Sequence, residues 1–114
     1  MIKVHGIKNC DTVKKALKWL EQNHIAYQFR DVRETPLSTE EVESWLAKIP
    51  AEQLVNKRST SWRQLDESQR DLSNHNAVSQ LIVEQPTLFK RPLVEADDEM
   101  QVGFNAQQWE AWLA

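Results

Sequence analysis

The sequence predicts an α/β fold on three observations. Residues 2–5 (IKVH) are predicted to form an opening strand, which leads through residues 6–9 into an amphipathic helix beginning near Thr12. Residues 26–32 read as a second strand, and strand, helix and strand within about thirty residues are typical of a right-handed parallel βαβ unit. A hairpin pattern and a final helix close the chain. Its 114 residues are enough for one domain with one core.

The first helix is predicted from its apolar spacing. Val13, Ala16, Leu17 and Leu20 recur at helical intervals, while lysines and other polar residues occupy the opposite face. Asp11 or Thr12 is expected to cap the first turn, which leaves Cys10 at or just before the helix start.

The middle of the chain, residues 36–85, is predicted to be mostly helical. Ser38 and Glu41 fit a capping box in front of a helical stripe, and Pro50 suits the first turn of a short helix that runs to Leu54. A further helix ends before Pro86. The apolar stripes of these helices are interpreted as core, because helical periodicity by itself predicts burial.

The pattern of the last part of the chain predicts a β-hairpin over residues 93–104, with an acidic turn at residues 97–99. Asn105 and Gln108 fit a capping box for the final helix. The predicted order is therefore β-α-β, helices, then β-β-α. This is the thioredoxin-like arrangement: a core of residues 1–35 and 86–114 and an inserted helical subdomain of residues 36–85, within a single domain of residues 1–114.

Cys10 is the only cysteine and is the leading candidate for a nucleophile. A thiol at a helix N-terminus meets unpaired backbone N–H groups and the positive end of the helix dipole, which favour the thiolate. The end of the first strand is also where open α/β sheets usually place their sites. The alternative is that Cys10 is simply a small buried apolar residue.

Composition excludes several classes of function. One cysteine cannot form an internal disulfide, and no signal-peptide pattern opens the chain, so a cytoplasmic location is expected. A net charge of -3 and the lack of a long apolar stretch predict neither nucleic-acid nor membrane binding. His5, His24 and His75 are scattered, and no metal site is expected.

Several segments, taken together in order, resemble the arsenate reductase (ArsC-like) family, most closely its YffB-type branch. They are residues 6–12 (GIKNCDT), residues 57–63 (KRSTSWR), Gln85–Pro86, and residues 90–93 (KRPL). The resemblance covers nearly the whole chain. It implies a thioredoxin-like domain with a helical insertion, a single nucleophilic cysteine, and arginines that bind an oxyanion or a thiol cosubstrate.

The resemblance carries over to individual residues. Cys10 matches the family nucleophile, and Arg91 and Pro92 match a pair in which the arginine binds an anion and the proline is cis, beside the thiol. A guanidinium can hold an oxyanion or carboxylate through two parallel hydrogen bonds. The family's middle arginine matches Arg58 in one alignment register, and in another register the aligned position is Asn56. The alternative interpretation of Arg91 and of Arg58 is a surface arginine exposed to solvent.

Two departures from known patterns shape the predicted mechanism. The family's third arginine has no counterpart in residues 100–104 (MQVGF), which weighs against arsenate as the substrate. Val13 stands where a thioredoxin carries its second cysteine, so an external thiol must resolve any mixed disulfide, and glutathione is the abundant candidate. The sequence thus predicts a glutathione-dependent reductase of a disulfide or small oxyanion, with no bound cofactor.

The alternative function is a redox-silent module that binds a protein partner. The resemblance extends to the Spx regulators, which share the fold and bind RNA polymerase. Their redox switch uses a Cys-x-x-Cys motif that this sequence lacks. A purely structural partner protein is a third interpretation.

Overall fold

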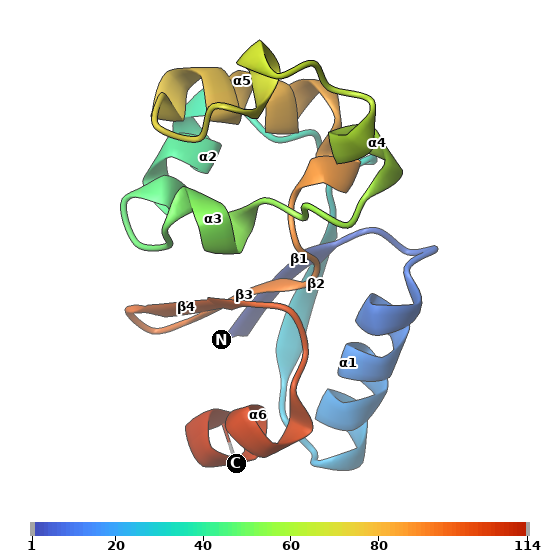
Figure 1. The fold of residues 1–114 in the computed structure, drawn as a ribbon. Coiled ribbons are helices and arrows are strands. Elements are labelled where there is room, and N and C mark those ends of the chain that lie inside the picture. Colours follow the sequence, from blue (N-terminus) through green and yellow to red (C-terminus); the bar gives the residue numbers. More distant parts are fainter. Residues whose placement is uncertain (1, 114) are drawn as a thin grey trace. The chain divides into compact units, whose positions relative to one another are not determined.

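A computed structural model describes residues 2–113 and has a mixed α/β, thioredoxin-like fold (Figure 1). The predicted fold class is confirmed. The chain divides into two compact units, one made of Met1–Glu34 and Arg91–Ala114 and the other of Thr35–Lys90.

The first unit contains a four-stranded sheet. Its strands are β1 (Ile2–Gly6), β2 (Tyr27–Asp31), β3 (Leu93–Ala96) and β4 (Glu99–Val102), in the order β2-β1-β3-β4. β1 pairs parallel with β2 and antiparallel with β3, which pairs antiparallel with β4. A βαβ unit and a hairpin therefore share one sheet, as in thioredoxins.

Two helices, α1 (Asp11–Gln22) and α6 (Ala106–Leu113), pack on one face of this sheet (Figure 1). The core between helices and sheet is formed by fully buried side chains: Val4, Ala16, Leu20, Val94 and Trp109. Ala16 and Leu20 are one helical turn apart in α1, which is why the apolar spacing predicted this helix.

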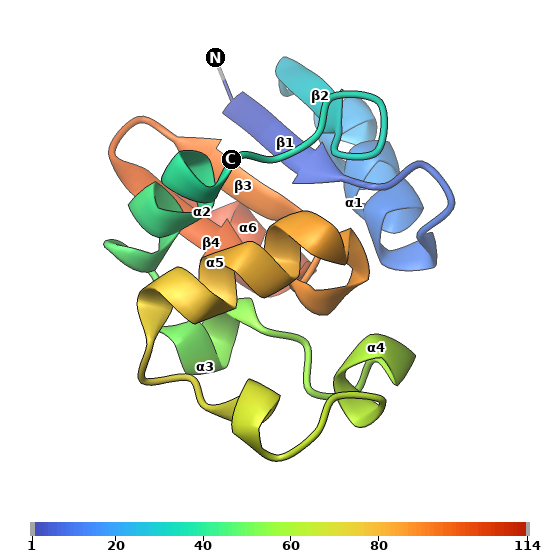
Figure 2. The same ribbon diagram turned by 90° about the horizontal axis from the view of Figure 1, so that it is seen from above.

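The second unit is helical. Its elements are α2 (Thr39–Leu46), α3 (Ala51–Leu54), α4 (Thr60–Arg63), η1 (Ser68–Arg70), α5 (His75–Glu84) and η2 (Pro86–Leu88), of which η1 and η2 are 3₁₀ helices. Helices α2 and α5 lie side by side (Figure 2). At the start of α2, Ser38 Oγ accepts a hydrogen bond from the Glu41 N–H at 3.1 Å, as the capping pattern predicted.

The structure differs from the sequence expectations at several element ends. The second unit extends to Lys90 rather than to residue 85, because Lys90 donates to the Leu54 carbonyl at 2.7 Å and Phe89 forms a β-bridge with Val55. Pro50 is the N-cap of α3 rather than a residue of its first turn. The short helix α4 was not predicted, because it is a single turn without apolar periodicity.

No helix among residues 2–113 is long and apolar enough to cross a membrane.

Candidate active site

Cys10 is the N-cap residue of α1. Its backbone is extended (φ -109°, ψ 121°), its carbonyl accepts the first helical hydrogen bond from Lys14 N–H at 3.0 Å, and its own N–H donates to the Ile7 carbonyl at 3.2 Å. The expectation that Asp11 or Thr12 would cap the helix is wrong, since Asp11 is already the first helical residue. The half-buried Cys10 is thus at the helix start, as the sequence predicted, and its side chain makes no capping hydrogen bond.

Gly6 allows β1 to pass close to α1 immediately before this turn. A Cβ atom on Gly6 would lie 2.8 Å from Val13 Cγ2, and Val13 is itself buried against the end of the strand. A side chain at position 6 would therefore push apart the two elements that position Cys10.

The turn between β1 and α1 is attached to the last residue of the parallel strand β2 and to the residue after it. Val32 N–H donates to the Gly6 carbonyl at 2.9 Å, and Lys8 N–H donates to Asp31 Oδ2 at 3.3 Å. Asp31 Oδ1 accepts from Arg33 N–H at 2.8 Å. Sequence reasoning did not identify Asp31, because Lys8 lies 23 residues away in the chain and no local motif links them.

Lys8 and Glu34 form an exposed ion pair beside these contacts. Lys8 Nζ lies 2.7 Å from Glu34 Oε1. The hydrogen bond to Glu34, followed by the charge of that carboxylate, raises the pKa of Lys8 above its ordinary value. An exposed pair of this kind contributes little to stability.

Arg91 and Pro92 lie at the same end of the sheet as Cys10. His5, near the end of β1, is paired with Leu93 at the start of the antiparallel strand β3. The residues after β1 and the residues before β3 therefore lie at the same end of the sheet. The Arg91–Pro92 peptide bond is cis, and the buried Pro92 accepts a hydrogen bond from Gly103 N–H at 2.9 Å. Arg91 is half-buried, with its Nε atom shielded from solvent.

Arg58 belongs to the second unit, whereas Cys10, Arg91 and Pro92 belong to the first. Arg58 is exposed, and its backbone N–H donates to Asn56 Oδ1 at 3.1 Å. Asn56 N–H in turn donates to the Leu88 carbonyl at 2.6 Å. The side-chain amide of Asn56 therefore stabilises the turn that carries Arg58, through a hydrogen bond from the Arg58 backbone.

His5, which is close to Cys10 in sequence, is engaged elsewhere. It is 4% exposed, its Nε2 lies 2.7 Å from Glu95 Oε2, and its Nδ1 lies 3.3 Å from Arg30 Nη1. A guanidinium can only donate, so Nδ1 accepts from Arg30 and the ring proton is on Nε2, facing Glu95. Since both ring nitrogens are occupied, His5 is not a base for the thiol.

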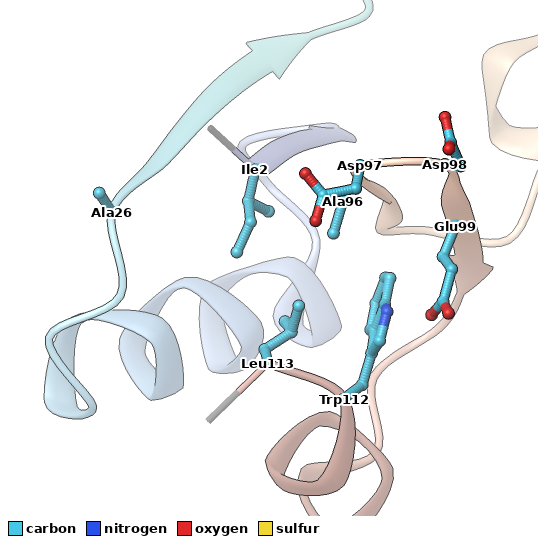
Figure 3. A pocket seen from close by; sticks show the side chains of 8 residues that line it. All are labelled: Ile2, Ala26, Ala96, Asp97, Asp98, Glu99, Trp112 and Leu113. Carbon is cyan, nitrogen blue, oxygen red and sulfur yellow. The ribbon is translucent and has the colours of Figure 1, made fainter.

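A separate cavity of about 540 Å³ lies at the opposite end of the sheet (Figure 3). Ile2, Trp112 and Leu113 provide apolar walls, and carboxylates come from the hairpin turn, Asp97 and Asp98, and from Glu99 at the start of β4. Because Ile2 begins β1 whereas Cys10 follows its end, this cavity is not part of the thiol site. No cluster of three or more potential metal ligands occurs within residues 2–113.

Comparisons with known proteins support the resemblance. The model of the ArsC family matches residues 5–112. A solved YffB protein structure superposes with a TM-score of 0.92 at 33% identity over 100% of both chains. A solved arsenate reductase (ArsC) related protein from Brucella melitensis gives a TM-score of 0.79 at 40% identity, covering 97% of this chain and 92% of the other. The global transcriptional regulator Spx 2 of Lactococcus lactis is 30% identical over 99% of this chain and 86% of its own.

Proposed function

Since this chain belongs to the ArsC family, we propose that it is a glutathione-dependent reductase of a disulfide or small oxyanion, with Cys10 as the nucleophile. The observation that carries the proposal is the position of Cys10 at the N-cap of a twelve-residue helix, α1. The first-turn N–H groups and the helix dipole stabilise negative charge there, and the thiolate is the form that attacks.

In the proposed reaction with a disulfide, the Cys10 thiolate attacks one sulfur of the substrate. An S–S bond to Cys10 forms as the substrate S–S bond breaks, and the second sulfur leaves as a thiolate. When the substrate is a glutathione mixed disulfide attacked at the glutathione sulfur, Cys10 becomes glutathionylated. A glutathione thiolate then attacks that glutathione sulfur, which regenerates Cys10 and releases oxidised glutathione.

The absence of an internal second thiol supports an external reductant. Val13, three residues after Cys10, is 1% exposed and packs against Gly6. It fills the place of a resolving cysteine with a buried apolar side chain. A reducing cytoplasm would supply glutathione in its place.

Arg91 is proposed to hold the carboxylate of glutathione or the oxyanion. Its position two residues before β3, at the end of the sheet where the chain leaves β1 toward Cys10, supports this role. A planar guanidinium forms paired hydrogen bonds with either group. Arg58 is a second proposed anion-binding residue, carried over from the family motif.

The test is to supply a glutathione mixed disulfide and glutathione and to follow the formation of oxidised glutathione, with mass spectrometry of Cys10 in parallel. The wild-type protein is expected to turn over and to accumulate a Cys10–glutathione adduct when free glutathione is scarce. Cys10→Ser should abolish both. Arsenate, supplied in a parallel assay, tests the oxyanion branch.

The alternative is a protein-binding module without reductase activity, acting on a partner such as RNA polymerase. The similarity to Spx 2 favours it. A wild-type protein that forms no glutathione adduct and reduces neither substrate would contradict the reductase proposal and favour this alternative.

A further inference from the structure

Asp31 is a buried carboxylate at the end of β2, only 9% exposed. Both of its oxygens accept hydrogen bonds from backbone N–H groups, Oδ2 from Lys8 and Oδ1 from Arg33. A carboxylate with little solvent contact requires such donors, because water no longer stabilises its charge.

One of these donors belongs to the turn that carries the nucleophile. Lys8 precedes Cys10 by two residues, and the turn closes through the bond from Cys10 N–H to the Ile7 carbonyl. The Gly6 carbonyl, at the other end of the turn, accepts from Val32 N–H. The turn is thus fixed to the β2 side at two points, and Asp31 provides one of them with its side chain.

We propose that Asp31 is a positioning residue for Cys10: it holds the turn of residues 6–10 so that the thiol stays at the N-terminus of α1. The inference rests on the proposed function, because it treats Cys10 as the reacting group. It assigns to a buried carboxylate a role in thiol reactivity that acts through the backbone of Lys8.

Asparagine cannot replace Asp31 in this role. The site presents two N–H donors, and a carboxylate offers an acceptor oxygen to each of them. An asparagine has one oxygen and one NH₂ group, so one backbone N–H would face another donor. Asp31→Asn therefore breaks a contact while it preserves the shape of the side chain.

The sign of the effect on Cys10 separates positioning from charge. Removing a nearby negative charge favours the thiolate, so a purely electrostatic role for Asp31 predicts faster alkylation of Cys10 in Asp31→Asn. Loss of positioning predicts slower alkylation, because the sulfur then leaves the helix N-terminus for part of the time.

The experiment compares Asp31→Asn with Glu34→Gln, a matched change of carboxylate to amide that affects only the exposed ion pair to the same Lys8. The rate of Cys10 alkylation by uncharged iodoacetamide is measured at fixed pH and well below the unfolding transition. We expect a fall of about threefold or more in Asp31→Asn and a change of less than about twofold in Glu34→Gln. Amide exchange at Lys8 should accelerate about tenfold in Asp31→Asn alone.

Unchanged or faster alkylation in Asp31→Asn, or an equal fall in Glu34→Gln, would overturn the inference. If Asp31→Asn does not fold, amide exchange in the wild-type protein provides the test. The Lys8 amide must then be more protected from exchange than the amide of exposed Asn9. Equal protection would reject the hydrogen bond from Lys8 to Asp31 on which the inference depends. Alkylation by iodoacetamide does not depend on glutathione, so it tests the role of Asp31 separately from the proposed function. A wild-type protein without glutathione turnover would refute the proposed function. The effect of Asp31→Asn on alkylation would still support or overturn the inference.

Discussion

Gly6 and Val13 approach so closely that a methyl group on Gly6 would lie 2.8 Å from Val13 Cγ2. This contact joins the end of β1 to the first turn of α1, on either side of Cys10. Val13 is β-branched and 1% exposed, so it has little freedom to move away.

We therefore expect Gly6→Ala to lower the free energy of unfolding by about 1–3 kcal/mol, the usual cost of overpacking a core. Denaturant unfolding measures this change. In a Val13→Ala background the same substitution should cost clearly less, because the clashing methyl groups are gone. Equal costs in both backgrounds would show that the Val13 contact is not the cause.

Arg91→Ala is expected to reduce the preference of Cys10 for an anionic reagent. The ratio of the alkylation rates with iodoacetate and iodoacetamide should fall about three- to tenfold, because the guanidinium proposed to attract the anion to Cys10 is removed. Using a ratio cancels any change in intrinsic thiol reactivity.

Lys90→Ala provides the matched control, since Lys90 is the exposed cation directly before Arg91. Its ratio should stay near that of the wild type. A similar fall in both variants would mean that the effect is general surface charge and not anion binding by Arg91.

Tyr27 provides a pH-dependent prediction. Burial, then the hydrogen bond to Glu21 and the charge of that carboxylate, raise the pKa of Tyr27 above its ordinary value of 10.0. The folded protein therefore holds this proton more tightly than the unfolded chain. Its contribution to stability is complete below pH 10.0 and is lost as pH rises through the folded-state pKa.

Tyr27 is the only tyrosine, so tyrosinate absorbance follows it directly. Glu21→Gln should lower its pKa while leaving it above the ordinary value, because the contribution of burial remains. Tyr27→Phe should weaken the loss of stability in alkali. A Tyr27 pKa that Glu21→Gln leaves unchanged would contradict the role of the carboxylate.

The His5 contacts predict a fixed tautomer. Nitrogen chemical shifts in NMR should show the proton on Nε2 and an unprotonated Nδ1, since Arg30 donates to Nδ1. Exposed His75 serves as the internal reference. A proton found on Nδ1 of neutral His5 would refute the assignment.

The sequence predicted those elements whose signals are local. The apolar spacing in α1 and the capping residues Ser38 and Asn105 are read within a few residues, and both caps are confirmed. The anchoring of Lys8 by Asp31 could not be predicted, because strand register brings them together. The roles of Arg91 and Arg58 came from the family motif and remain predictions.

The edge-to-face contact of Trp19 with Trp109, at 5.8 Å between ring centroids and 79° between planes, gives the first unit a built-in optical signature. Two indoles held this close and at a fixed angle couple their strong electronic transitions, which adds an aromatic contribution to the far-ultraviolet circular dichroism. Because one ring belongs to α1 and the other to α6, the signal requires both helices to be packed together. The packing of the helix that follows Cys10 can therefore be monitored in solution without any added label.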